Sequence, residues 1–244
     1  MSTKSRIALI SGSTHGIGKA IAHRFTDDGW IVVQNSRNPI SNSELIGAKH
    51  LVADVTLAAD CQSLVANVIS EFGQIDALIC NTGSSVRNSV ELDKTDPLEH
   101  FLSINLKSAS NLISASIEAL KESRGSVTAI SSICGIASIN GAPIEYSVAK
   151  AALNTYIKSL AIKYGPQGVR FNVVAPGNVL FSGSTWDHKL KNNEDAVRAY
   201  ISENVPMNGF VEPKEVAAAV AFLASQESNS TTGAVLVIDR GQSL

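Results

Sequence analysis

The hydrophobic positions of this chain fall into two kinds of segment. Short apolar runs rich in β-branched residues alternate with longer segments whose apolar residues recur at helical period. The short runs show no alternation of apolar and polar residues, so both faces of each predicted strand must be covered by other elements. This requirement predicts an α/β fold in which helices cover both faces of a doubly wound parallel sheet. The predicted strands are residues 7–10, 31–33, 50–52, 77–80, 126–130, 170–174 and 234–238.

Two stretches depart from this alternation. Between the second and third strands, Pro39 and Gly47 leave too little room in residues 38–49 for a full helix, which predicts a short turn-like crossover. Residues 177–210 are rich in Gly, Ser and Asn around a charged helical piece, and the length of this irregular stretch predicts a functional loop or lid. No repeat, low-complexity tract or linker divides the chain, so we expect residues 1–244 to form one domain.

Composition narrows the class of protein. The chain is 44% hydrophobic and 17% charged with a formal net charge of -2, which is typical of a compact globular protein rather than a disordered or nucleic-acid-coating one. Cys61, Cys80 and Cys134 form no CxxC pair, so we expect neither a disulfide framework nor a metal site. We expect a cytoplasmic protein without a membrane partner, because the chain has no signal-peptide pattern and no apolar run of membrane-spanning length.

A glycine-rich turn joins the first predicted strand to an amphipathic helix. Glycines permit a tight turn and let backbone N–H groups approach a pyrophosphate, which the positive end of the helix dipole stabilises. The glycine spacing differs from the common GxGxxG pattern, and a plain tight connection is the alternative interpretation. The candidate cofactor-binding residues of this turn are Gly12, Ser13, Thr14, His15, Gly16, Ile17 and Gly18.

The residues after the second strand discriminate between the two nicotinamide dinucleotides. A carboxylate there would accept from the ribose hydroxyls of NAD(H), whereas a cation would bind the 2′-phosphate of NADP(H). Residues 34–38 contain no carboxylate and include Ser36 and Arg37, which favours NADP(H) over NAD(H). His15 could add a donor; the alternative is that Arg37 and His15 are only solvated loop residues.

A Tyr–Lys pair carries the predicted chemistry. Tyr146 and Lys150 are four residues apart, so on a helix they lie on one face, about a dozen residues after Ser132. A free phenol titrates near pH 10, and a neighbouring ammonium is expected to lower that pKa toward the range of a general acid/base. The Ser132 hydroxyl can hydrogen-bond a substrate oxygen as charge builds on it. Taken alone, such a pair is also typical of an ordinary amphipathic helix.

These motifs occur together with Asp54 after the third strand, Asn81-Thr82-Gly83 after the fourth, Asn105, and Pro176-Gly177. In this order and spacing, from residue 7 to about residue 241, the chain resembles the short-chain dehydrogenase/reductase family, and within it the 3-oxoacyl-[acyl-carrier-protein] reductase branch. The resemblance implies a single Rossmann-type domain of about seven strands. It also implies a small-molecule carbonyl or alcohol substrate.

The resemblance assigns catalytic roles to four residues. Tyr146 would protonate the carbonyl oxygen during reduction, and Lys150 would lower the pKa of that phenol while binding the nicotinamide ribose. Ser132 would orient the carbonyl. Asn105 would hold a water that links Lys150 to solvent; an amide inside a helix that bonds only to backbone is the alternative. The further cofactor-binding residues that the resemblance implies are Asp54 and Val55 at the adenine, Asn81 and Gly83 at the adenosine ribose and pyrophosphate, and Pro176, Gly177 and Val179 at the nicotinamide.

The chain departs from the family pattern at three places. Cys80-Asn81-Thr82-Gly83 replaces the Asn-Asn-Ala-Gly that usually ends this strand in the family, and this change is expected to preserve cofactor binding. The family often has a threonine that bonds the nicotinamide carboxamide shortly after Pro-Gly, whereas residues 178–181 contain none, leaving Ser182, Ser184 or Thr185 as substitutes. Near the end, Arg240 replaces the first glycine of Asp-Gly-Gly, which is expected to alter the subunit contact or the substrate pocket.

The predicted function is NADPH-dependent reduction of a ketone or 3-oxo group. Two alternatives stay open: an NAD-dependent alcohol or sugar dehydrogenase working in the oxidative direction, and a dinucleotide-binding regulatory protein without catalysis. The aromatic residues of the predicted lid, residues 177–210, either close over the substrate or are routine packing. The family resemblance implies that Asn140 and Glu145 face the substrate. The apolar helical segments 102–120 and 149–164 resemble the family's subunit interface, which implies a homotetramer or homodimer without a nucleic-acid partner; the alternative is that both segments only cover the sheet.

Overall fold

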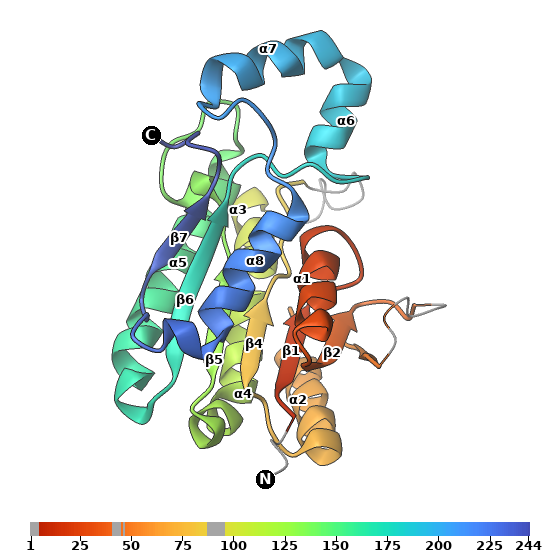
Figure 1. Ribbon diagram of the computed structural model, residues 1–244, viewed down its shortest axis with the longest axis vertical. Coiled ribbons are helices and arrows are strands. Elements are labelled where there is room, and N and C mark those ends of the chain that lie inside the picture. Colours follow the sequence, from red (N-terminus) through yellow and green to blue (C-terminus); the bar gives the residue numbers. More distant parts are fainter. Residues whose placement is uncertain (1–4, 41–44, 46, 87–95) are drawn as a thin grey trace.

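The computed structural model describes residues 5–40, 45, 47–86 and 96–244. All seven strands join one parallel sheet in the order β3-β2-β1-β4-β5-β6-β7, with helices on both faces (Figure 1). The predicted doubly wound fold is confirmed. The strands are β1 (Ile7–Ser11), β2 (Ile31–Ser36), β3 (Lys49–Val52), β4 (Ala77–Cys80), β5 (Ser126–Ile130), β6 (Arg170–Pro176) and β7 (Val235–Ile238).

The central strands are buried on both faces. Every residue of β1, β4 and β5 is buried, and Leu9 of β1 lies between Val33 of β2 and Leu78 of β4. The chain order reverses between β1 and β4, so the loops after these two strands diverge at the carboxyl edge of the sheet. Such a switch point is where doubly wound sheets bind ligands.

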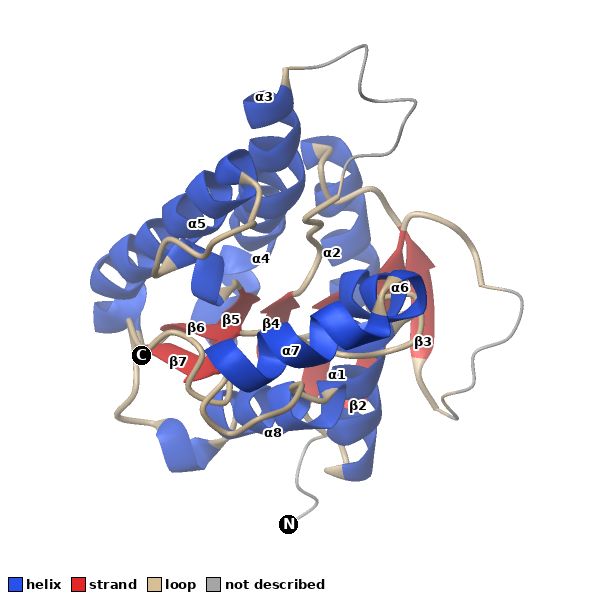
Figure 2. Cartoon of the chain, turned by 90° about the horizontal axis from the view of Figure 1, so that it is seen from above, coloured by secondary structure: helices blue, strands red, loops and turns tan. Residues whose placement is uncertain are grey.

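Two helical layers cover the sheet (Figure 2). On one face, α2, α4 and α5 pack in a core that includes Leu64, Leu112 and Phe171. On the other face, α1 and α8 pack in a second core that includes Phe25 and Val220. The helices are α1 (Gly16–Asp27), α2 (Ala58–Phe72), α3 (Pro97–Leu102), the π-helix η1 (Ser103–Lys107), α4 (Ser108–Ser123), the 3-10 helix η2 (Ile133–Gly135), α5 (Ile144–Tyr164), the 3-10 helix η3 (Gly165–Gln167), α6 (Thr185–Asn192), α7 (Glu194–Asn204), α8 (Pro213–Ala224) and the 3-10 helix η4 (Gln226–Ser228).

The crossover between β2 and β3 falls partly outside the described residues, which omit 41–44 and 46. Its described residues contain no helix, and Gly47 has a positive φ of 86° that suits a turn. These observations agree with the predicted turn-like crossover as far as the described residues reach.

The segment 177–210 is more regular than its composition suggested. It forms α6 and α7, which lie above the carboxyl ends of the strands (Figure 1). Ser184 caps α6 by accepting from the Asp187 amide, and Asn193 caps α7 by accepting from the Ala196 amide. The Ser and Asn residues that read as loop are thus helix caps. We call residues 177–210 the lid segment below.

The lid segment has a small core of its own. Val197, Ile201 and Val205 are buried, and Trp186 stacks on Tyr200 with ring centroids 5.5 Å apart. These two aromatic side chains therefore pack within the segment, which agrees with the alternative that they are routine packing.

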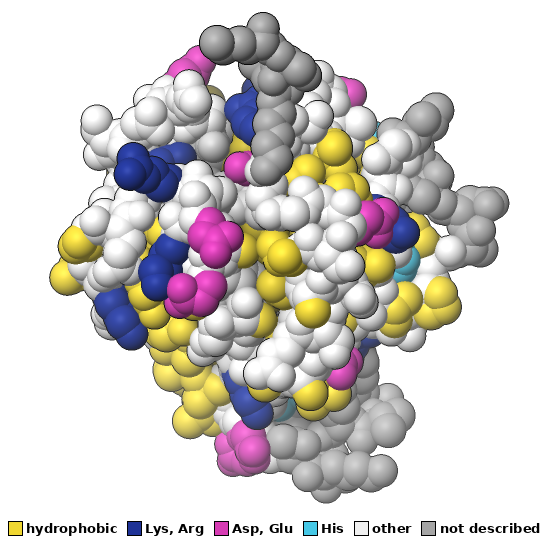
Figure 3. Space-filling model, turned by 90° about the horizontal axis from the view of Figure 1, so that it is seen from below, with side chains coloured by type: hydrophobic (Ala, Val, Ile, Leu, Met, Phe, Trp, Pro, Cys, Tyr) yellow, Lys and Arg dark blue, Asp and Glu magenta, His cyan; other side chains and the backbone are white. Residues whose placement is uncertain are grey.

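At the opposite end of the molecule, acidic, basic and apolar side chains are interspersed over the visible surface (Figure 3). Charges of one sign do not gather on this face, in keeping with the formal net charge of -2. Within the described part of the chain, no helix combines the length and the apolar character needed to cross a membrane.

Candidate active site

Ser132, Tyr146 and Lys150 meet at the carboxyl end of β5. Ser132 caps the short helix η2, and its Oγ accepts from the Cys134 amide at 3.2 Å. Tyr146 lies in the first turn of α5 and Lys150 one turn later, with the ammonium nitrogen 5.8 Å from the centre of the phenol ring. The three side chains predicted from the sequence therefore share one site.

Lys150 is buried under the end of the sheet. Its side chain is only 3% exposed, and its Nζ donates to the carbonyl of Ile130 at 2.8 Å. Burial lowers the pKa of this lysine to about 8. Two glycines make room for it: a Cβ at Gly83 would lie 3.0 Å from Nζ, and one at Gly135 would lie 2.7 Å from the Lys150 backbone.

The pKa of Tyr146 corrects an expectation. Burial raises the pKa of this phenol above its ordinary value, and a hydrogen bond with the Ser132 side chain opposes only part of that rise. The predicted lowering by Lys150 is therefore wrong for this structure. The physical reason is that the ammonium donates to the Ile130 carbonyl rather than to the phenol, while the phenol ring packs edge-on against Phe101.

Asn105 lies in the π-helix η1 and is 1% exposed. Its amide nitrogen donates to the Ser84 and Phe101 carbonyls at 3.0 and 3.1 Å, and its Oδ1 accepts from the Ser84 amide at 3.1 Å. The side chain thus fastens the loop after β4 beside Lys150, as the alternative of a backbone-bonded amide had it. Its role in holding a water stays a prediction.

The glycine turn has the geometry of a phosphate site. Gly12 and Gly16 have φ of 60° and 54°, which disfavour other residues, and a Cβ at Gly18 would lie 2.2 Å from the Gly12 carbonyl oxygen. From the end of β4, Asn81 holds the turn by donating to the Ser11 and Gly12 carbonyls at 3.1 and 2.8 Å.

The first turn of α1 fits an anionic group. No side chain caps this helix, and its first turn contains no acidic residue. Backbone amides at such a terminus attract phosphate, so these residues fit the pyrophosphate of a dinucleotide.

The predicted turn residues are not equivalent. Ser13 is buried, and its hydroxyl donates to the Ile10 carbonyl at 2.9 Å and accepts from the Asn35 amide at 3.1 Å. Ser13 therefore holds the turn to β2. Thr14 and His15 lie at the surface, with their side chains 3.5 Å apart, and half-buried Ile17 packs against the core.

On the adenine side, Arg37 is exposed at the tip of the turn after β2. The Ser36 hydroxyl donates to the Asn38 carbonyl at 2.7 Å and pairs with the His50 ring at 2.8 Å, so it closes the turn that carries Arg37. Because the hydroxyl hydrogen goes to Asn38, the His50 Nε2 hydrogen goes to Ser36.

The Asp54 carboxylate accepts from the Thr56 amide and hydroxyl at 2.9 and 2.7 Å, which shapes the turn into α2. Val55 is buried, and its carbonyl accepts from the Asn111 side chain of α4 at 3.3 Å. Asp54 and Val55 thus lie at the carboxyl end of β3, as predicted.

On the nicotinamide side, Pro176 ends β6, and a Cβ at Gly177 would lie 2.8 Å from the Asp239 Cβ, so the chain passes close to the end of β7. Val179 is 8% exposed and pairs with Val211 in a parallel bridge, so its side chain belongs to the core.

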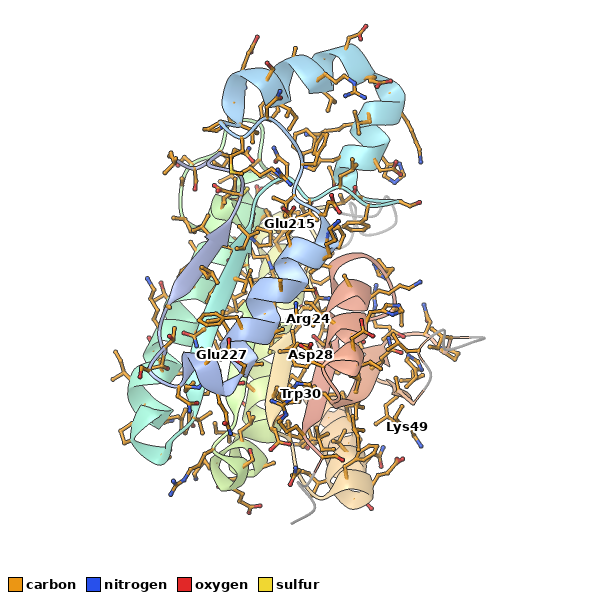
Figure 4. All side chains as sticks on the ribbon, in the orientation of Figure 1. Arg24, Asp28, Trp30, Lys49, Glu215 and Glu227 are labelled. Carbon is orange, nitrogen blue, oxygen red and sulfur yellow. The ribbon has the colours of Figure 1, made fainter. Side chains whose placement is uncertain are left out.

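Arg240 resolves one departure from the family pattern. Its guanidinium donates to both carboxylate oxygens of Glu215 at 2.9 and 3.1 Å and to the Phe210 carbonyl at 2.7 Å. Glu215 lies in the first turn of α8, below the lid segment (Figure 4). Within this chain, Arg240 therefore ties the C-terminal turn to the end of the lid segment.

Several site residues escaped sequence reasoning. Asn81 was expected to line the ribose, but its role of holding the glycine turn was not foreseen, and neither were the contacts of Asn111 and Phe101 or the Ile130 carbonyl. Phe181 was grouped with the aromatic residues of the lid segment, but the packing of its ring over Gly16 was not foreseen. These contacts join segments far apart in the chain, so no local pattern signals them.

Comparison with known proteins agrees with this geometry. A family model described as enoyl-(acyl carrier protein) reductase matches residues 12–243. The 3-oxoacyl-[acyl-carrier-protein] reductase of Salmonella typhimurium is 35% identical, over 99% of this chain and 98% of that protein. The L-fucose dehydrogenase of Mus musculus is 32% identical, over 98% and 89%. The solved structure of ligand-free aldohexose dehydrogenase from Thermoplasma acidophilum has a TM-score of 0.86 at 28% identity, over 98% of this chain and 94% of that one. The chain therefore belongs to the short-chain dehydrogenase/reductase family and is an NAD(P)-dependent oxidoreductase.

Proposed function

We propose that this protein reduces a ketone or 3-oxo group to an alcohol with NADPH. The observation that carries the proposal is the convergence of Ser132, Tyr146 and buried Lys150 at the carboxyl edge of the sheet that also holds the glycine turn. The likeness to a 3-oxoacyl-[acyl-carrier-protein] reductase supports a 3-oxo substrate.

The residues of the site divide the work of reduction among them. Bound NADPH supplies the hydride. Tyr146 carries its proton at neutral pH, as an ordinary phenol does, and can give that proton to the substrate oxygen as charge builds there. The Ser132 Oγ accepts from the Cys134 amide, and its hydroxyl hydrogen-bonds the phenol, which places that hydroxyl where it can donate toward the same substrate oxygen. The Lys150 ammonium stabilises the phenolate that remains.

The preference for NADP(H) rests on Arg37. Its exposed guanidinium follows β2 in a turn closed by Ser36, and this turn lacks a carboxylate that would accept from ribose hydroxyls. An arginine suits a 2′-phosphate because it offers a planar set of donors with a permanent charge.

Parallel titration with NADPH and NADH, followed by a 3-oxoacyl thioester, tests the proposal. We expect tighter binding of NADPH and loss of absorbance from the reduced nicotinamide on addition of the thioester. Tyr146→Phe is expected to bind NADPH as wild type does while losing turnover. Turnover that survives in Tyr146→Phe would refute the assigned role of the phenol, and tighter binding of NADH would refute that of Arg37.

A second candidate is an NAD-dependent sugar dehydrogenase working in the oxidative direction. The likeness to an L-fucose dehydrogenase and to an aldohexose dehydrogenase supports it. Incubation with NAD⁺ and a panel of aldohexoses and 6-deoxyhexoses tests it, and appearance of the reduced nicotinamide would favour this candidate over the reductase. Dinucleotide binding without turnover on either panel would favour a regulatory protein.

We also propose a homotetramer built on α4 and α5. Ile162 and Val148 of α5 are 82% and 47% exposed, and apolar side chains at such positions suit a subunit interface. Light scattering on the purified protein tests this proposal, and a mass near 25.7 kDa would refute it.

A further inference from the structure

The ring of Phe181 lies on the second glycine of the phosphate-binding turn. A Cβ built on Gly16 would lie 2.6 Å from both Cε2 and Cζ of Phe181, and 3.1 Å from its Cδ2. Real side chains do not approach so closely, so the absence of a side chain at Gly16 is what lets the ring rest there. Gly16 thus has a backbone reason to be glycine in its φ of 54°, and its lack of a side chain also leaves the Phe181 ring room to lie on the turn.

The surface under this ring is the one that an anionic ligand must reach. Gly16 is the first residue of α1, whose amino terminus carries no side-chain cap and no acidic residue in its first turn. Backbone amides at such a terminus bind phosphate only when the phosphate can approach them directly. A half-buried aromatic ring placed over the first helical residue restricts that approach.

Phe181 is also joined to the lid segment. Its carbonyl accepts from the Ser184 amide at 2.9 Å, and its own amide donates to the Ser184 Oγ at 3.3 Å. Ser184 caps α6, and Trp186 in the first turn of that helix stacks on Tyr200. The chain entering α6 passes over the amino-terminal turn of α1 (Figure 1). The backbone that carries the ring is therefore hydrogen-bonded to the cap of α6, so a movement of this backbone would be passed to the start of the helix.

We propose that Phe181 sets the affinity of this protein for dinucleotides, because its ring must leave Gly16 before the dinucleotide phosphates reach the first turn of α1. The ring and the phosphates compete for the same turn, and binding moves α6. The inference rests on the dinucleotide cofactor of the family and not on the choice between NADP(H) and NAD(H), since both dinucleotides carry the same pyrophosphate.

A binding measurement separates the two questions. Dissociation constants for NADP⁺ and NAD⁺ are measured by calorimetry on wild type, Phe181→Ala, Phe181→Leu and Phe222→Ala. Phe222 lies on α8 and is 42% exposed, so it controls for the loss of a phenylalanine away from the turn. If the ring covers the turn about nine-tenths of the time, its removal tightens binding of either dinucleotide about tenfold.

We expect Phe181→Ala to bind both dinucleotides more tightly with their affinity ratio unchanged, Phe181→Leu to lie in between, and Phe222→Ala to match wild type. Unchanged or weaker binding by Phe181→Ala would overturn the inference while leaving the proposed function intact. The role of Arg37 is tested by Arg37→Ala, which is expected to weaken binding of NADP⁺ but not of NAD⁺ and so to change the ratio of the two affinities. Failure of every variant to bind either dinucleotide would overturn the proposed function and this inference together.

Tryptophan fluorescence reports on α6 separately. The chain has two tryptophans, Trp186 in α6 and Trp30 near the other end of the molecule (Figure 4). Saturating NADP⁺, which does not absorb at the emission wavelength, is expected to change the emission of wild type but not of Trp186→Phe. Phe181→Ala without ligand is expected to emit like liganded wild type. An emission that NADP⁺ leaves unchanged in wild type would overturn the predicted motion of α6.

Discussion

The burial of Lys150 predicts a pH-dependent stability that can be isolated by one substitution. Lys150→Met replaces the ammonium with an apolar side chain of similar length. In the folded protein the pKa of Lys150 is lowered from 10.5 to about 8, so the unfolded chain binds the proton more tightly than the folded one. Folding is therefore opposed by about 3 kcal/mol below pH 8, and this opposition is relieved as pH rises from 8 toward 10.5.

The magnitude between two accessible pH values follows directly. Between pH 7 and pH 9.5, wild type is expected to gain about 2 kcal/mol of stability relative to Lys150→Met. Raising the pH beyond 10 would bring in Tyr146, whose raised pKa stabilises the fold below pH 10 and loses that effect above it. The comparison is therefore kept below pH 10.

Urea unfolding of the dinucleotide-free protein at the two pH values measures this difference, with both variants compared at each pH so that all other titrating groups cancel. Lys158→Met, on the exposed side of α5, controls for the loss of a positive charge from the same helix. A stability difference between wild type and Lys150→Met that is the same at pH 7 and pH 9.5 would show that the lysine does not have the lowered pKa. A wild type that loses stability relative to Lys150→Met as the pH rises from 7 to 9.5 would refute the reasoning outright.

Three further outcomes are expected. Gly18→Ala should lose roughly 3 kcal/mol of stability in urea unfolding, because its Cβ would meet the Gly12 carbonyl oxygen at 2.2 Å and the backbone must shift; a loss under about 1 kcal/mol would contradict this. Arg240→Ala should lower the free energy of unfolding by about 1–2 kcal/mol through loss of its bonds to Glu215 and Phe210. Arg240→Gly should lower it by about 1 kcal/mol less, because φ at this position is 57° and glycine adopts that value without strain; equal losses for the two variants would rule out backbone strain. Of the three thiols, only half-buried Cys134 should react with a disulfide reagent at pH 8 in the native protein, because burial raises the pKa of Cys61 to about 11 and that of Cys80 further; all three should react in urea.

The sheet was predictable because each strand carries its own evidence. The predicted strands at 77–80 and 126–130 coincide with β4 and β5, which are buried on both faces and mostly apolar, with Ser126 and Thr128 as the polar residues of β5. The two lid helices were not predicted as separate elements. Their caps, Ser184 and Asn193, are small polar residues that are equally typical of loops, and only the structure shows that each accepts from an amide three residues later.

In the candidate site, too, local features were predictable from the sequence and contacts between distant segments were not. The approach of Tyr146 to Lys150 follows from helical spacing, which is a local property. The pKa of each group follows from burial, which depends on Phe101, Gly83, Gly135 and the Ile130 carbonyl, all distant in the chain. Spacing therefore predicted which residues meet but gave the wrong direction for the pKa of the phenol.

Burial shifts the pKa values of the two central groups in opposite directions, and this bears on proton transfer in the site. It raises the pKa of the Tyr146 phenol and lowers that of the Lys150 ammonium, because both shifts disfavour the charged form. A phenol with a raised pKa holds its proton at neutral pH but is a weaker acid, so donation to a substrate oxygen requires stabilisation of the phenolate that remains. Oxidation of an alcohol would begin from the phenolate, which this environment disfavours unless a further positive charge lies nearby. Reduction leaves this phenolate behind and oxidation begins from it, so both directions depend on a positive charge that stabilises it, which makes the charge on Lys150 their common requirement.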